Sequence, residues 1–446
     1  MHYGNNMKIL LYKPGTSDGS ENEMPNLGMG IIARSIKDAG HKVEVYDGHL
    51  TYSGVRHDIP LSGYGFDIVA LSLVSLEHQK RVSKDEGLSV WLGGPHAYSY
   101  YDLIEGFDKI IVGEADGQID TILNSKERIV QLPHPDKLVS PDYSDFYGKE
   151  KMIGYTTYIS RGCTNRCSFC QSGHAHGKFR IRPLEDVYQE FDSIKQYPKV
   201  ETIHMVDDSF SADLLHAKKF LEWYIQQEYP YKLNIFNVRA DQIDKELLML
   251  MKLARVTILP IGVESGCQEV YDFVGKGETL EDIRKAIIMI QGMGIIPWLN
   301  MIVGLPKDTV KNNRESINWV LGIDDPKIVH WFQYAPFRRT KAYSWLVEEG
   351  AIEDGYTPKP YGDRYDKLPW KPDFEIVDFT IQEREVAQLE SYLSTHSPIL
   401  INNINHVIDL CLKYDMMNLL EDWFMFAPIR QYVEKDRPNK QRKGQI

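Results

Sequence analysis

Three of the five cysteines stand within eight residues of one another, in the stretch Arg161-Gly162-Cys163-Thr164-Asn165-Arg166-Cys167-Ser168-Phe169-Cys170. This spacing after the apolar run 155–159 predicts one loop that wraps a metal centre. Thiolates are soft ligands that suit iron–sulfur clusters or zinc. Three cysteines would leave a four-iron cluster with one iron that lacks a protein ligand and is open to a small molecule. The alternative on spacing alone is structural zinc, with His174 or His176 completing a Cys3His set.

Four polar motifs follow apolar runs farther along the chain, where the ends of strands are expected. They are Asp207-Asp208-Ser209-Phe210, Asn237-Val238-Arg239, Gly262-Val263-Glu264-Ser265-Gly266 and Gly304-Leu305-Pro306. A guanidinium at a strand end can pair with a ligand carboxylate, and a carboxylate beside a hydroxyl can hold an ammonium or a ribose. The paired aspartates could serve acid–base chemistry or a divalent metal, or could cap a helix and fix a loop. Asp241 is expected to cap the helix that follows Arg239.

A further set of candidates lies at the ends of short apolar runs in residues 1–131. The set contains Ser72, Gly93, Gly94, Gly113 and Glu114. Ligands of open parallel sheets bind beyond the carboxyl ends of the strands, where a glycine lets the backbone approach a flat group or a phosphate. The alternative is that these glycines only allow tight turns.

Apolar runs that alternate with helical patterns are the elements that would position these residues. In the N-terminal part we expect strands at 7–12, 43–46, 67–72, 90–92 and 109–112 and a helix at 29–39. A second series of strands, which makes six βα units, is expected at 155–159, 200–206, 232–238, 257–261, 297–303 and 328–334. The pattern predicts an α/β fold, with a Rossmann-like doubly wound parallel sheet followed by a partial (β/α)6 barrel.

We therefore expect four segments along the chain. They are a sheet domain at 1–131, a proline-rich linker at 132–150, the barrel at 151–340 and a small, mainly helical region at 341–446. In the last segment, helical patterns at 382–395 and 402–424 are expected to cover the open barrel.

Composition narrows the class of protein. A chain of 446 residues with 43% hydrophobic content can bury sizeable cores. No apolar run reaches the roughly 18 residues of a membrane span, and residues 1–13 lack the order of a signal peptide, so a cytoplasmic location and no membrane partner are expected. The formal charge of -12 argues against a nucleic-acid partner. Cys267 and Cys411 are expected to be buried apolar residues and not ligands.

The C-x3-C-x2-C spacing, with Phe169 just before the last cysteine and the four motifs behind it, resembles the radical S-adenosylmethionine (SAM) superfamily. The N-terminal motifs are similar to the cobalamin-binding domain that precedes many radical SAM cores. They are Pro25-Asn26-Leu27-Gly28, Ala39-Gly40-His41-Lys42-Val43, Gly93-Gly94-Pro95-His96 and Val112-Gly113-Glu114. The chain is thus identified as resembling the cobalamin-dependent (class B) radical SAM methyltransferases.

The resemblance implies three sets of site residues. A [4Fe-4S] cluster would be held by Cys163, Cys167 and Cys170. SAM would be contacted by Phe169, Asp208, Arg239, Glu264, Ser265 and Gly304. Cobalamin would be contacted by Ser72, Val74, Ser75, Gly93, Gly94, Gly113 and Glu114.

One marker of cobalamin proteins is incomplete. Asp47-Gly48-His49 resembles the start of the Asp-x-His-x-x-Gly motif that supplies a histidine to cobalt, but Tyr52 stands at the glycine position. We therefore expect base-off cobalamin without a lower histidine, with residues 73–76 as neighbours of the lower cobalt face.

The function that the resemblance implies is methylation of an unactivated carbon. One SAM would yield a 5'-deoxyadenosyl radical, methylcobalamin would supply the methyl group, and a second SAM would remethylate cobalamin. An electron donor of the flavodoxin or ferredoxin type would be needed. The short C-terminal region favours a peptide or protein substrate, such as a glutamine of methyl-coenzyme M reductase. The alternatives are a cyclase or rearrangement enzyme with the same cofactors, or a cobalamin carrier or sensor with a vestigial barrel.

Overall fold

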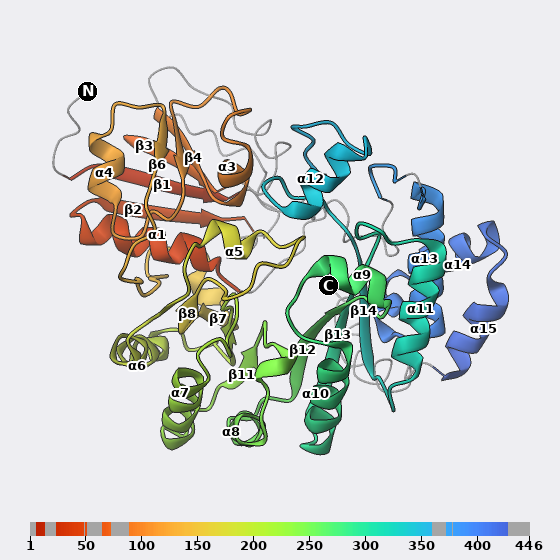
Figure 1. The fold of residues 1–446 in the computed structure, drawn as a ribbon. Helices are drawn as coiled ribbons and strands as arrows, with labels where there is room; N and C mark the ends of the chain where they lie inside the picture. Colours follow the sequence, from red (N-terminus) through yellow and green to blue (C-terminus); the bar gives the residue numbers. More distant parts are fainter. Residues whose placement is uncertain are drawn as a thin grey trace, which may run out of the picture.

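The computed structural model describes residues 6–13, 24–48, 50, 65–72, 89–358, 372–376 and 378–426 (Figure 1). An N-terminal sheet lies beside a barrel-like set of strands and helices, and the C-terminal helices pack on the far side of that set (Figure 1). Both parts have the α/β architecture expected from the alternation of apolar runs and helical patterns.

The N-terminal sheet has six parallel strands in the order β2-β1-β3-β4-β5-β6. Their bounds are β1 (Lys8–Lys13), β2 (Lys42–Asp47), β3 (Ile68–Ser72), β4 (Ser89–Gly93), β5 (Lys109–Val112) and β6 (Ile129–Gln131). The first five match the predicted strands, while the short β6 was not predicted. Its helices are α1 (Leu27–Asp38), α3 (Pro95–Tyr100) and α4 (Ile119–Asn124). Because β1 lies between β2 and β3, the strand order reverses there, which places a ligand site at the carboxyl ends of these strands.

The second part is an open half-barrel of six parallel strands in two ladders. The ladders are β11-β10-β7 and β12-β13-β14, and a bridge between Val238 and Ile261 connects them. The strands are β7 (Gly154–Thr157), β10 (Thr202–Met205), β11 (Lys232–Ile235), β12 (Ile258–Glu264), β13 (Ile296–Val303) and β14 (Ile328–Gln333). Among the described residues no ladder joins β7 to β14, so the predicted partial barrel is confirmed.

Helices alternate with these strands. They are α6 (Leu184–Ser193), α7 (Leu214–Gln226), α8 (Lys245–Leu253), α9 (Gln268–Val274), α10 (Leu280–Gly292) and α11 (Val310–Leu321). Thr279 and Asp282 form a capping box at the start of α10. The predicted cap at Asp241 is wrong, because the N-cap of α8 is Asp244 and the Asp241 carboxylate instead pairs with Arg239.

The C-terminal region is helical, with α12 (Lys341–Glu348), α13 (Ile381–Ser394), α14 (Ile404–Lys413) and α15 (Met417–Phe426). The helical pattern expected over 402–424 corresponds to two helices, α14 and α15, because the helix is interrupted at Asp415, whose φ of 55° lies in the left-handed region. Helix α13 packs along the edge strand β14, where Gln333 Nε2 donates to the Arg384 carbonyl at 2.9 Å. The basic residues Lys435, Arg437, Lys440, Arg442 and Lys443 near the end of the sequence lie outside the described residues.

The segment expected as a linker is packed against the N-terminal domain. Tyr143 is fully buried, and a Cβ on Gly30 of α1 would lie 2.4 Å from its ring. Lys37 of α1 pairs with Asp142 and Asp145 at 2.8 Å each. These contacts join residues 132–150 to α1, so the segment follows the domain surface closely.

Candidate functional site

A cavity of about 500 Å³ lies between the carboxyl edge of the N-terminal sheet and the nearest loops of the half-barrel. Five of the residues expected at cobalamin line it, namely Ser72, Gly93, Gly94, Gly113 and Glu114. The half-barrel contributes Tyr158, Arg161, Gln171, His176 and Asp208. The expected contacts Val74 and Ser75, and His49, lie outside the described residues.

The glycines of this edge have different physical roles. A Cβ on Gly93 would meet no atom of the described residues within 4 Å, so the missing side chain leaves the cavity open. Gly113 is needed by its turn, because its φ is 109° and a Cβ would lie 2.7 Å from the Leu132 carbonyl oxygen. Gly94 has a φ of 89° at the start of α3. Tight-turn geometry therefore accounts for Gly94 and Gly113, whereas Gly93 provides the space that a large flat cofactor would need.

The three clustered cysteines lie on an excursion, residues 162–179, between β8 (Ser160–Arg161) and β9 (Arg180–Ile181). All three are free and partly buried. Burial raises the pKa of the Cys167 thiol to about 12, and the neighbouring Cys170 adds to the rise. A soft, positively charged metal centre would hold such thiols as thiolates.

The arrangement fits an iron–sulfur cluster better than structural zinc. In the part of the chain that the structure describes, no three His, Cys, Asp or Glu side chains converge closely enough to hold one metal ion. Cysteines of a four-iron cluster bind different irons and need not converge on one point. His176, one candidate for a Cys3His set, instead faces carboxylates, with Nδ1 3.4 Å from Glu114 Oε1 and Nε2 4.0 Å from Asp208 Oδ2.

The two aspartates after β10 fix the loop that leads to the cysteines. Asp207 Oδ1 accepts from the backbone N–H groups of Ile159 at 3.0 Å and Ser160 at 2.6 Å. Burial raises the pKa of Asp207 to about 7. Asp208 Oδ2 accepts from Gly162 N at 2.8 Å, at the start of the excursion. The loop-fixing role is thus confirmed for both, and Asp208 alone of the expected SAM contacts also lines the cavity.

Arg239 lies beside the cysteine excursion, and all three nitrogens of its guanidinium donate hydrogen bonds within the protein. Its Nε and Nη2 donate to Asp241 at 3.0 and 2.8 Å, and Nη1 donates to the Lys276 carbonyl at 2.8 Å. Asn165, which stands between Cys163 and Cys167, lies beside this guanidinium: with its amide turned, its Oδ1 atom accepts from Arg239 Nη1 and Nε at 3.1 Å each. The structure therefore holds this guanidinium rigidly near the cysteines.

Glu264 belongs to a buried charge cluster that was not predicted. It ends β12 after a register shift, and its φ of 68° is left-handed. Lys276 Nζ lies 3.4 Å from Glu264 Oε1 and 2.9 Å from Glu278 Oε1. Burial raises the pKa of Glu264, and the Lys276 ammonium offsets this only in part. Strained backbone of this kind persists where the surroundings enforce it and is common at functional sites.

Of the other expected SAM contacts, Ser265 and Gly304 make hydrogen bonds within the protein, and Phe169 packs against the core. Ser265 Oγ accepts from Cys267 N at 3.1 Å and lies 3.1 Å from Ser316 Oγ. Gly304 has a φ of 83°, and its N–H donates to Asp308 Oδ2 at 2.8 Å. Phe169 is partly buried against the core. None of the three lines the cavity.

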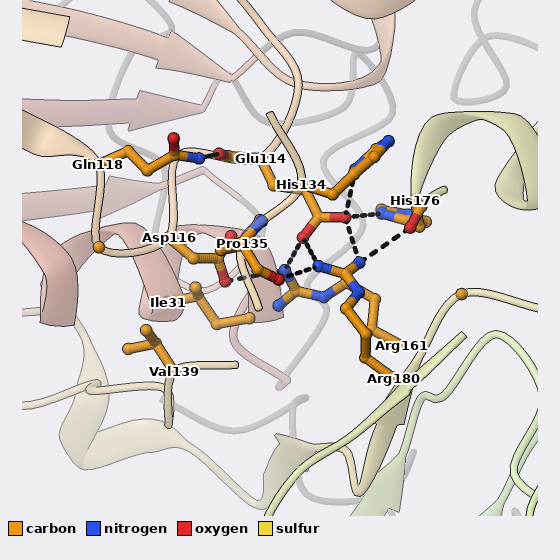
Figure 2. Close-up of polar contacts among 12 residues, drawn as sticks. Ile31, Glu114, Asp116, Gln118, His134, Pro135, Val139, Arg161, His176 and Arg180 are labelled. Atoms are coloured by element: carbon orange, nitrogen blue, oxygen red, sulfur yellow. Dashed lines mark hydrogen bonds and ion pairs between the residues drawn. The ribbon is translucent and has the colours of Figure 1, made fainter. Parts of the chain in front are cut away.

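A network of charges joins the N-terminal domain to the base of the cysteine excursion (Figure 2). The Glu114 carboxylate pairs with Arg161 at 2.9 Å and with Arg180 at 2.6 Å, and its Oε1 atom lies 3.3 Å from His134 Nδ1. Burial alone would raise the pKa of Glu114, but His176, Arg180 and Arg161 hold it well below its ordinary value. The sequence alone did not identify Arg161 and Arg180 as partners of Glu114. The only signal in the sequence was that these two arginines flank the segment with the three cysteines.

Comparisons with known proteins show what this chain is similar to. The sequence profile of the radical SAM superfamily matches residues 157–320. An anaerobic magnesium-protoporphyrin IX monomethyl ester cyclase of Rubrivivax gelatinosus is 27% identical over 44% of this chain, which spans only 35% of that protein. An uncharacterized methyltransferase of Pyrococcus horikoshii is 23% identical over 78% of this chain and 84% of its own length.

Two solved structures share the architecture across both parts of the chain. The radical SAM methyltransferase TsrM from Kitasatospora setae, with cobalamin and a [4Fe-4S] cluster bound, superimposes with a TM-score of 0.62 at 16% identity over 78% of each chain. The cobalamin-dependent SAM radical enzyme OxsB superimposes with a TM-score of 0.64 at 16% identity over 94% of this chain and 72% of its own. Residues 157–320 therefore match the radical SAM superfamily, and the fold of the chain is similar to that of these cobalamin-dependent enzymes.

Proposed function

We propose that this protein is a cobalamin-dependent radical SAM methyltransferase that methylates an unactivated carbon. The observation that carries the proposal is the single cavity shared by the glycine edge of the sheet and by Asp208, which also holds the start of the cysteine excursion. The cysteines themselves do not line the cavity, but Gln171, next to Cys170, does, so a cofactor at Gly93 would lie close to a cluster at the cysteines. The resemblance in fold to TsrM supports this assignment.

When bound, the cluster and SAM supply a 5'-deoxyadenosyl radical, and methylcobalamin supplies the methyl group that a second SAM restores. The protein's own residues would bind and orient these groups. Gly93 leaves room for the flat macrocycle, and the cavity wall is largely apolar. Glu264, held by Lys276, would receive the ammonium of SAM, and Arg239 would stay close to its carboxylate.

Several finer features belong to the same proposal. We propose base-off cobalamin, a flavodoxin-type or ferredoxin-type electron donor and a cytoplasmic location, where thiols stay reduced. The substrate class that we propose is a peptide or protein, such as a glutamine of methyl-coenzyme M reductase. A TsrM structure that contains tryptophan supports an amino-acid-derived substrate. In the described part of the chain no helix is both long and apolar enough to cross a bilayer.

The second candidate is a cyclase or rearrangement enzyme with the same cofactors, which the similarity of 44% of this chain to the Rubrivivax gelatinosus cyclase favours. The two are separated by incubating anaerobically reconstituted protein with methyl-labelled SAM, a reductant and candidate peptides. A methyltransferase forms 5'-deoxyadenosine and S-adenosylhomocysteine together with labelled peptide. Formation of 5'-deoxyadenosine with product but without S-adenosylhomocysteine would establish the second candidate instead.

A further inference from the structure

The excursion that bears the three cysteines closes at its base on two arginines. Strands β8 and β9 pair antiparallel, with Arg161 directly opposite Arg180. Like charges placed opposite each other on neighbouring strands destabilise the pairing. The base of the excursion, residues 162–179, therefore requires an anion between these two side chains.

Glu114, from the other domain, lies between them. Its Oε1 accepts from Arg180 Nη2 at 2.6 Å, and its Oε2 accepts from Arg180 Nη1 at 3.0 Å and from Arg161 Nη1 at 2.9 Å. Asp116 accepts a second bond from Arg161 Nη1 at 2.8 Å. Two carboxylates of the N-terminal domain thus balance two guanidiniums of the half-barrel (Figure 2).

Both partners of the contact are held firmly. The Glu114 side chain is 5% exposed, so salt screens the pair only weakly. The turn at Gly113 fixes where Glu114 leaves the sheet. The imidazole ring of His134 also packs against the cysteine excursion. A Cβ added to Gly177 of the excursion would lie 2.3 Å from that ring.

We propose that Glu114 is a positioning residue, which holds the base of the cysteine excursion closed through Arg161 and Arg180. The N-terminal domain then determines where the cysteines lie relative to the cavity. The inference rests on the proposed function only for the identity of the cluster that the cysteines hold. Glu114, which the sequence suggested as a cobalamin contact, would serve chiefly to join the two cofactor regions.

The test is hydrogen–deuterium exchange of the full chain before any cofactor is added, with peptides that cover residues 162–179. Glu114→Gln keeps the shape of the side chain and removes its charge, which leaves two buried guanidiniums with one carboxylate. Exchange in 162–179 should then rise about tenfold or more, because removal of one partner of a buried ion pair is strongly destabilising. Peptides of β1 and β3 should exchange as in the unchanged protein.

Two further variants make the test specific. Glu114→Gln combined with Arg180→Gln removes the unbalanced charge and should restore part of the protection. Asp102→Asn is the matched control, because Asp102 also joins the two domains, through Arg338 at 2.6 Å, but is 44% exposed. Its exchange in 162–179 should be unchanged.

The proposal would be overturned if the Glu114→Gln variant showed unchanged hydrogen–deuterium exchange in residues 162–179. It would also be overturned if exchange rose equally in the peptides of β1 and β3. A double variant that is no better protected than the single one would have the same consequence. Because no cofactor or substrate takes part, these outcomes are independent of whether the protein transfers a methyl group.

Discussion

The carboxyl edges of the sheet and of the half-barrel carry different kinds of residue. At the sheet edge, Gly93 borders the cavity with no described atom near the place of its missing side chain. At the barrel edge, Glu264 and Arg239 are buried and are already paired with Lys276 and Asp241. The sheet therefore offers shape and space, which suits a large flat cofactor. The barrel offers charges that internal partners hold in place, which suits a zwitterion such as SAM.

The largest effect is expected at the cysteines. Replacing Cys163, Cys167 and Cys170 by alanine should abolish the visible absorption of the reconstituted cluster, bound iron and SAM cleavage, because all three proposed thiolate ligands are then missing. Cys267→Ala and Cys411→Ala, which change buried cysteines, are the matched controls and should retain all three. Retained iron in the triple variant would contradict the cluster assignment.

The next effect should separate the sheet from the barrel. Gly93→Leu places a side chain in the cavity and should expel cobalamin, so that methylated peptide and S-adenosylhomocysteine are lost while 5'-deoxyadenosine still forms. The matched control is Gly292→Leu at the end of α10, where a Cβ also meets no described atom within 4 Å. An equal loss of both small molecules in Gly93→Leu, with an unchanged cluster spectrum, would contradict a dedicated cobalamin site.

A charge change at the barrel edge should have the converse effect. Glu264→Gln should weaken SAM binding by about 1.5–3 kcal/mol, the usual loss of a charge-assisted hydrogen bond, while cobalamin binding is unaffected. Isothermal titration calorimetry with SAM and the reconstituted protein measures the SAM affinity. The absorption spectrum of bound cobalamin measures cobalamin binding. Glu281→Gln, at an exposed pair with Lys285, is the control. Unchanged SAM affinity would remove Glu264 from the binding residues.

The smallest effect concerns pH and should arise in the barrel. The pKa of Asp207 in the folded protein, about 7, is above the value of about 4 in an unfolded chain. The folded state therefore binds the proton more tightly, and the contribution of Asp207 to stability is lost as pH rises from about 4 to about 7, by at most about 1.4 kcal/mol per pH unit.

Urea unfolding of the cofactor-free chain between pH 5 and 8 measures this dependence. Asp207→Asn keeps the acceptor for Ile159 and Ser160 but cannot ionise, so its stability should fall less steeply over this range. Asp192→Asn, at an exposed pair with Lys195, should behave like the unchanged protein. Identical slopes for all three proteins would show that Asp207 stays ionised.

Much of the fold could be predicted because its signals are local. Apolar runs of strand length and helical periodicity depend on neighbouring residues, so five strands of the sheet and six of the half-barrel were predicted within a few residues. The capping box at Thr279 is local for the same reason. The break at Asp415 was missed, because the apolar pattern continues through it and only the left-handed backbone ends the helix.

The positions of the clustered cysteines, the glycines at strand ends and the order of the elements could be read from the amino-acid sequence, since each depends on residues close together in the chain. Which charges meet depends on the folded arrangement of distant segments. Arg180 and Glu114 are 66 positions apart, and Arg161 and Glu114 are 47 apart, so no periodicity relates them. Lys276 and Glu264, which lie on either side of α9 in the chain, likewise meet only in the fold. Buried charges must be neutralised wherever the fold brings them, and that requirement, which acts across domains, gave Glu114 its partners.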